Sequence, residues 1–203
     1  MRSLFTTAIL TLAIAGAVQA APKMEAGKYN IDPMHSKVGF EIPHLVISTV
    51  EGKFKDFSGT LTLDDKFEKS KLDAVVEISS VDTSVGDRDT HLKSPDFFDA
   101  AKYPKMTFKS TGITGKPESF KLTGDLTIKD KTKKVVFDGV YKGSVVDAYG
   151  NTKAVFTANT KISRKEFGLT WSKMVEAGPV VGDEVTIELK IQAAKDKPVA
   201  AKK

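Results

Sequence analysis

The sequence contains no cysteine and few of the residue groupings that metal proteins and enzymes require. Without cysteine among its 203 residues, the chain has no disulfide bond, thiol nucleophile or thiolate metal ligand, so packing alone must hold the fold. The three histidines, His35, His44 and His91, lack the close spacing that is typical of zinc sites. We therefore expect neither a bound metal nor a cofactor.

The short motifs that mark common catalytic sites are also missing. No G-x-S-x-G elbow is present, and "GKYNIDPMHSKVG" lacks the lysine and hydroxyl order of a phosphate-binding P-loop. The basic run "KDKTKK" is typical of a solvated turn between strands. These absences disfavour a covalent hydrolase or a nucleotide-binding enzyme, and we predict no catalytic residues.

The first 20 residues have the three parts of a secretory signal peptide. Arg2 is followed by the apolar run "AILTLAIAGAV" and the small-residue site "VQA", and the run is shorter than the about 20 residues that span a bilayer. We predict cleavage after Ala20 and localisation in the periplasm or outside the cell. The alternative, a retained membrane anchor, is disfavoured by that short length.

Residues 21–193 fit a single domain, which a polar tail follows. A chain of this length matches the usual size of about 100–200 residues for one domain. The formal net charge of +5 is mild and lacks a dense Arg/Lys stripe, so we expect no nucleic-acid partner but transient contact with membrane surfaces. Residues 194–203 offer little to bury and are expected to be disordered.

Alternation of apolar and polar residues is the dominant pattern after Lys28. In "HSKVGFEI" it places Val38, Phe40 and Ile42 on one face. The same period of two predicts strands over residues 54–63, 72–81, 106–113, 120–128, 135–146, 154–162 and 185–191. Many half-buried antiparallel strands at short spacing favour an all-β sandwich or barrel.

Small residues interrupt the predicted apolar faces at Gly124, Gly139, Gly143 and Ala158. An eight-stranded barrel is just wide enough to fill itself with side chains or to hold one small ligand. Small residues on its inner wall would leave a slot, but they would equally suit bends or bulges at barrel corners. Periodicity leaves both interpretations open.

Helical signal is scarce and is strongest within residues 87–104, "DRDTHLKSPDFFDAAKYP". We predict a short helix there, with Ser94 as N-cap and Pro95 at the first helical position, and a second one in "PHLVIS". Arg88 is expected to pair with Asp87 or Asp89.

The same stretch has a chemical alternative. Asp87, Asp89 and His91 would share a face if extended, as metal ligands or an acid–base group could, but helix caps and ion pairs use acids as readily. We favour a structural knot. At least one of Phe97 and Phe98 should then face the core or a pore, because burying one is worth about 1.5–3 kcal/mol.

Longer blocks of the sequence carry a family resemblance. The chain contains, in order, "YNIDPMHSKVGFEIPHL", "VEGKFKDFSGTLTLD", "SSVDTSVGDRDTHLKSPDFFDAAKYPKMTFKST", "LTGDLTIKDKTKKVVF" and "ISRKEFGL". Together they closely resemble the YceI-like family of exported lipid- or polyisoprenoid-binding proteins. The resemblance implies a lipocalin-like, extended antiparallel β-barrel of about eight strands with one or two short helices. It also implies an elongated apolar pore that holds a long-chain lipid.

The apolar residues of the predicted faces are therefore candidates to line a pore. They are Phe40, Ile42, Leu45, Phe54, Phe97, Phe98, Met106, Phe108, Leu122, Leu126, Phe137, Tyr141, Phe156 and Phe167. The expected ligand is a polyisoprenoid or similar chain lipid, such as an isoprenoid quinone or a polyprenyl phosphate, and a homodimer is left open. Two alternatives are an exported lipid-modifying enzyme using the same pocket and a filled barrel that acts through its surface in envelope stress.

Overall fold

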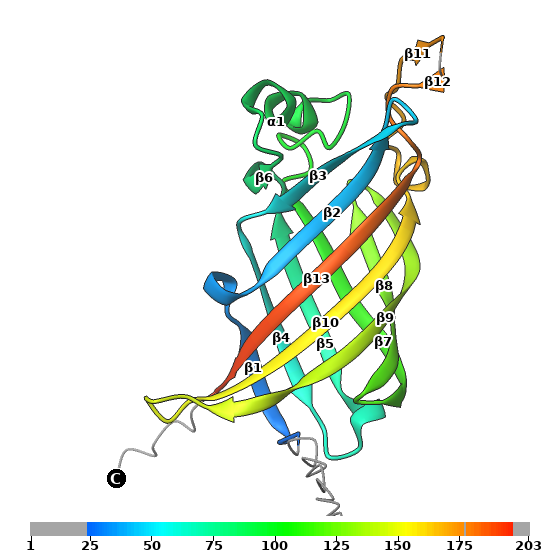
Figure 1. The fold of residues 1–203 in the computed structure, drawn as a ribbon. Coiled ribbons are helices and arrows are strands. Elements are labelled where there is room, and N and C mark those ends of the chain that lie inside the picture. The colour runs from blue at the N-terminus through cyan, green and yellow to red at the C-terminus, as the bar shows by residue number, and fades with distance from the viewer. Residues whose placement is uncertain (1–23, 177, 197–203) are drawn as a thin grey trace, which may run out of the picture.

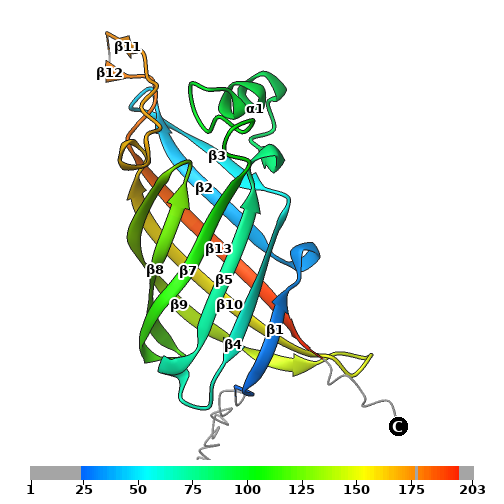
Figure 2. The same ribbon diagram turned by 180° about the vertical axis from the view of Figure 1, so that it is seen from behind.

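The protein is built almost entirely of antiparallel strands (Figures 1 and 2). The computed structural model describes residues 24–176 and 178–196. Its strands are β1 (Gly27–Ile31), β2 (Lys37–His44), β3 (Ser48–Phe54), β4 (Phe57–Leu63), β5 (Lys71–Glu77), β6 (Val81–Asp82), β7 (Lys105–Lys116), β8 (Ser119–Ile128), β9 (Lys131–Val146), β10 (Thr152–Ser163), β11 (Met174–Val175), β12 (Gly178–Pro179) and β13 (Glu184–Lys195). Its helices are α1 (Gly86–Lys93) and the 3₁₀ turns η1 (Pro33–His35), η2 (Phe67–Lys69), η3 (Ile78–Ser80) and η4 (Lys165–Phe167).

Eight of these strands close into a barrel. Hydrogen-bonded neighbours follow the order β1-β4-β5-β7-β8-β9-β10-β13, and β13 also pairs with β1. The strands cross the barrel obliquely in both views, as closure requires (Figures 1 and 2). The predicted all-β barrel of about eight strands is therefore confirmed.

A bend divides the N-terminal strand into β1 and β2. β13 pairs with β2 through residues 186–190 and with β1 through residues 193–195. Between them, Asp32 caps η1 by accepting from the Met34 amide at 3.1 Å, and its other oxygen lies 2.9 Å from His35 Nδ1 and 3.5 Å from Lys153 Nζ. Burial alone would raise the pKa of Asp32, but hydrogen bonds from His35 and Gln192 outweigh it and lower that pKa.

The strand predicted over residues 54–63 is also divided, which corrects one sequence prediction. Residues 54–63 do not form one strand: β3 ends at Phe54 and β4 begins at Phe57. β1 and β3 were not predicted, because each has only one fully buried side chain, Tyr29 or Phe54, and otherwise alternates between half-buried and exposed residues. Their pairing with β2 and β4 defines them instead.

The predicted helices are both wrong in place. The observed helix α1 ends where one was predicted to begin, because Ser94 precedes Pro95 and adopts the extended ψ of 169° that a following proline favours. "PHLVIS" forms the end of β2 and a tight turn over residues 45–47, in which Leu45 and Val46 have positive φ angles. Left-handed backbone at both residues excludes an α-helix there.

The residues from η3 to β7 cross one end of the barrel, over which α1 lies (Figures 1 and 2). We call this the helix end; it also carries turn 45–47 and the segment 164–183. Ile78 and Val81 bury themselves with Phe54 beneath this crossing. Among the described residues, no helix is long and apolar enough to cross a membrane.

The predictions for the two ends of the chain have different outcomes. β13 continues through Ala194 and Lys195, which pair with Asn30 and Tyr29, so the predicted tail begins too early by these two residues. Residues 197–203 lie outside the described part of the chain. So does the predicted signal peptide, residues 1–20, which stays a prediction.

Candidate functional site

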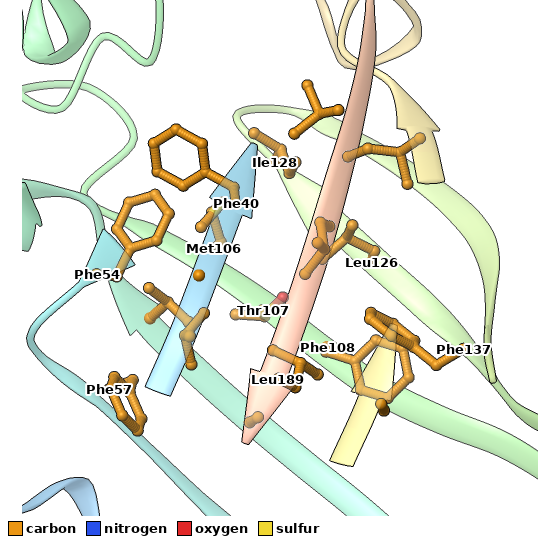
Figure 3. A pocket seen from close by; sticks show the side chains of 18 of the residues that line it. Phe40, Phe54, Phe57, Met106, Thr107, Phe108, Leu126, Ile128, Phe137 and Leu189 are labelled. Carbon is orange, nitrogen blue, oxygen red and sulfur yellow. The ribbon is translucent and has the colours of Figure 1, made fainter. Parts of the chain in front are cut away.

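An apolar cavity of about 570 Å³ lies inside the barrel, within the range of about 300–1,000 Å³ that is usual for ligand pockets. Most of its lining side chains are apolar. Figure 3 shows Phe54 and Phe57 on one side of the space and Phe137 on the other. The alternating strands supply this lining because every second residue points inward.

Most predicted pore residues line this cavity. They are Phe40, Ile42, Phe54, Phe97, Phe98, Met106, Phe108, Leu122, Leu126, Phe137 and Phe156. Their aromatic rings pack on one another, with centroid distances of 5.8 Å for Phe40–Phe54 and 5.5 Å for Phe108–Phe137. As ligand contacts these residues stay predictions.

Three predicted pore residues do not line the cavity. Leu45 lies in the turn after β2, outside the alternating part of the strand. Phe167 is 1% exposed in the core at η4. Tyr141 is buried, and its ring centroid lies 5.2 Å from that of Phe156. Among the described residues, its hydroxyl is the one buried side-chain nitrogen or oxygen without a hydrogen-bond partner.

Of the predicted small residues, Gly124 and Gly139 are covered by aromatic rings, whereas Ala158 lines the cavity. A Cβ at Gly124 would lie 2.3 Å from the Phe108 ring, and one at Gly139 would lie 2.3 Å from the Phe120 ring. Rings from the neighbouring strands therefore occupy the space over these glycines, and neither glycine leaves a slot. Ala158, paired with Gly139 across the strands, does line the cavity.

Gly143 fits the corner interpretation. Its φ is 125°, and the register of β9 and β10 shifts beside it. A positive φ and a register shift are typical of a β-bulge, where glycine is favoured.

Packed aromatic rings fill the end of the barrel opposite α1. Phe67 of η2 meets Phe120 at 5.1 Å, and Phe120 meets Phe156 at 6.5 Å. Tyr29 is fully buried beside this group, and burial, with smaller contributions from Glu25 and Tyr141, raises the pKa of Tyr29 to about 12. Tyr29 is therefore neutral at ordinary pH.

Ionisable side chains gather at the helix end of the cavity. Apart from Lys71 at the start of β5, the ionisable lining residues are His44, Asp87, Arg88, His91 and Arg164. The cavity thus has an apolar interior and one polar end. This arrangement suits an amphiphile whose chain is buried and whose head group stays near α1.

Thr83 organises the knot that the sequence predicted around Arg88. Arg88 Nε donates to Thr83 Oγ1 and Arg88 Nη2 to the Thr83 carbonyl, both at 2.7 Å. Asp89 accepts from the Thr83 amide at 2.9 Å and from its hydroxyl at 2.6 Å. The predicted direct ion pair is wrong, because the buried threonine connects the two charges.

His91, Phe97 and Trp171 form an aromatic cluster at the helix end of the cavity, which we call its mouth. His91 Nε2 lies 2.8 Å from Asp96 Oδ2, and the His91 ring centroid lies 5.0 Å from Phe97 and 4.9 Å from Trp171. In the described parts of the chain, no three His, Asp or Glu side chains gather closely enough to hold a metal ion. His91 and Asp89 therefore have structural partners.

The sequence did not point to Arg164 or Trp171 as functional residues. Arg164 directly follows β10, and Trp171 lies in the irregular segment between β10 and β13. Arg164 is 3% exposed and donates to the carbonyls of Gly182, Leu169, Trp171 and Val181 at 2.5–3.3 Å. Burial lowers its pKa and nearby Asp183 opposes that shift. The guanidinium thus ties this segment over the cavity. The signal that could have identified Trp171 was that it is the chain's one tryptophan and lies in a segment without alternation.

Comparisons with known proteins agree with this architecture. The sequence model of the YceI-like domain family matches residues 29–193. Protein YceI of Escherichia coli is 35% identical over 192 residues, covering 93% of this chain and 98% of that protein. The structure of Burkholderia cenocepacia BcnA, at 25% identity, superimposes with a TM-score of 0.71 over 80% of this chain and 98% of that one. A polyisoprenoid binding domain from Saccharophagus degradans, at 12% identity, shares the fold with a TM-score of 0.66 over 85% and 100% of the two chains.

Proposed function

The chain belongs to the YceI-like domain family, and from that membership and its cavity we propose that it is an exported protein that binds a polyisoprenoid or similar long-chain lipid. The observation that carries the proposal is the apolar cavity of about 570 Å³ with one polar end. A relative by fold is described as a polyisoprenoid binding domain, which agrees with a lipid ligand. The protein would shield the chain of that lipid from water.

Apolar contact area would supply most of the affinity. Each buried CH₂ group is worth about 0.8 kcal/mol, so a five-carbon isoprene unit adds about 4 kcal/mol before the cost of ordering it. Affinity should rise with chain length until the cavity is full. Head-group identity should matter less, because ionisable lining groups lie mainly at the helix end.

The polar end supports an orientation for the ligand. Arg88 lines the cavity there, and a quinone carbonyl or a phosphate would meet its guanidinium at the helix end. The chain of an isoprenoid quinone or a polyprenyl phosphate would then point toward Phe67 and Phe120. We propose these two head-group classes as ligands.

Export rests on the sequence of residues 1–20. The charged start, apolar run and small-residue site of this stretch support delivery to the periplasm or the medium. The mature protein should begin at Ala21. N-terminal sequencing of protein recovered from the periplasmic fraction tests this, and an intact Met1 on membrane-bound protein would contradict it.

A binding role fits the side chains better than catalysis. Asp89 is held by Thr83, and His91 contacts Asp96 and two aromatic rings. Neither has the free position that proton transfer to a bound lipid would need. A filled barrel that acts only through its surface is disfavoured by the size of the cavity.

Mass spectrometry of the lipids that copurify from the native host tests the proposal. The protein is purified without detergent and extracted with organic solvent. We expect a chain lipid in near-equal amount to the protein, and less of it in an Ala158→Leu variant purified in parallel. Recovery of no lipid above background, or equal recovery from both proteins, would contradict binding in this cavity.

A further inference from the structure

Four large apolar side chains stand in solvent at the helix end of the barrel. Turn 45–47 carries Val46, 61% exposed, and Ile47, 91% exposed, while the β11–β12 hairpin carries Met174 and Val175, 74% and 44% exposed. We call these four residues the apolar tip. Grouped exposed apolar residues mark interaction sites more often than isolated ones do.

The two parts of the apolar tip form one surface beside the cavity. The Leu45 amide donates to the Val180 carbonyl at 3.0 Å, and the Gly182 amide donates to the Pro43 carbonyl at 2.8 Å. Pro43 and Val180 also line the cavity. Figures 1 and 2 both show the β11–β12 hairpin next to the turn between β2 and β3. The apolar tip therefore adjoins residues that line the cavity.

The backbone conformation of turn 45–47 indicates that its apolar residue types were not chosen for folding stability. Leu45 and Val46 have φ angles of 51° and 67°, a left-handed conformation that asparagine or glycine adopts at lower cost and that is unusual for β-branched valine. Such strain is concentrated at functional sites. The turn presents apolar side chains where polar ones would fold more easily.

The charge around the tip distinguishes a bilayer from other partners. Charged residues make up 28% of the chain, yet residues 42–50, "IPHLVISTV", and 178–182, "GPVVG", contain no Lys, Arg, Asp or Glu. Lys173 and Glu176 flank Met174 and Val175 with opposite charges. An interface with a protein usually has a polar rim, whereas the boundary between head groups and acyl chains accepts an apolar, uncharged tip.

We propose that the apolar tip inserts into the surface of a lipid bilayer and places the mouth of the cavity against it. A chain lipid could then move between bilayer and cavity without crossing water. That consequence rests on the proposed lipid-binding function, whereas the membrane contact itself does not. Since the tip carries almost no net charge, the contact should need no anionic lipid.

Vesicle flotation of the purified protein tests the contact. The tip variant combines Ile47→Asn with Met174→Gln, and the matched control combines Val145→Asn with Tyr149→Gln, which are exposed apolar residues on the β9–β10 hairpin at the opposite end. Wild type and control should bind vesicles of phosphatidylcholine alone, with little effect of salt. The tip variant should bind at least about tenfold more weakly, a difference of about 1.4 kcal/mol.

Geranylgeraniol titration without vesicles separates this proposal from the proposed function. Equal affinities in all three proteins, together with the loss of vesicle binding in the tip variant, support the membrane contact. No vesicle binding by the wild type, equal binding by the tip variant, binding that needs anionic phosphatidylglycerol and disappears in salt, or tip-dependent self-association without vesicle binding would each overturn it. If geranylgeraniol fails to bind while the flotation result holds, the proposed function fails and the contact stands.

Discussion

Replacing Ala158 with leucine should weaken lipid binding without unfolding the barrel. Ala158 lines the cavity from β10, opposite Gly139 in β9 and Leu189 in β13. Leucine adds three carbon atoms, which would exclude ligand carbons worth about 0.8 kcal/mol each. The binding free energy should therefore fall by about 2–3 kcal/mol, or roughly 50-fold in Kd at about 1.4 kcal/mol per factor of ten.

The fold should tolerate this change because the added atoms enter open space. Overpacking a filled core costs about 1–3 kcal/mol, and here the unfolding free energy should change by less than about 1 kcal/mol. Calorimetric titration with geranylgeraniol measures the affinity, and a denaturant transition measures the stability.

Ala148→Leu is the matched control, because Ala148 is exposed in the turn between β9 and β10. This variant should bind as the wild type does. Binding of geranylgeraniol by Ala158→Leu as tight as that of the wild type, with unchanged stability, would show that Ala158 does not line the binding site. A loss of unfolding free energy in Ala158→Leu as large as its loss of binding free energy would also contradict this prediction, because misfolding would then explain the weaker binding.

Four further predictions concern the packing of the barrel wall at Gly139, the clasp that Arg164 forms with the segment between β10 and β13, acid stability, and catalysis. Gly139→Ala should lower the unfolding free energy by about 1–3 kcal/mol, because its Cβ would lie 2.3 Å from the buried Phe120 ring; an unchanged denaturant midpoint would show that the ring moves freely. Arg164→Met leaves four carbonyls without their donor, so it should lower Tm and speed hydrogen exchange over residues 168–182, and unchanged exchange would argue against the clasp. The lowered pKa of Asp32 means that its carboxylate stabilises the fold fully above its ordinary pKa of about 4 and that this stability is lost as pH falls through the lower folded value; Asp32→Asn should flatten the fall of Tm in that acid range, and a parallel pH profile would exclude this role. His91→Ala should change geranylgeraniol affinity only slightly, and wild-type lipid turnover that vanished in this variant would reveal an enzyme.

Strand alternation was enough to predict an all-β sandwich or barrel and most of its inner face, and the family resemblance narrowed this to a barrel. Leu122, Leu126 and Phe137 sit on long strands with one buried side, so their positions follow from the sequence. The strand β3 could not be found in this way, because hydrogen bonding to β2 defines it and only Phe54 of its residues is buried.

Local signals were misleading where non-local neighbours decide the structure. Gly124 and Gly139 looked like gaps, yet rings from adjacent strands cover them, and that requires the strand register. Ser94 looked like a helix start, but Pro95 fixes it in the extended conformation that ends α1. Trp171 reaches the mouth from an irregular segment, for which periodicity gives no direction.

The position of a bound chain lipid shows whether the barrel cavity is the binding site. A geranylgeraniol analogue with a photoreactive diazirine at its hydrocarbon end is bound to the protein, irradiated, and mapped by mass spectrometry of the labelled peptides. We expect labels within the cavity, on strands such as those that carry Leu122 and Phe137. Labels confined to the outer face of the barrel, or to the apolar tip alone, would contradict binding in the cavity.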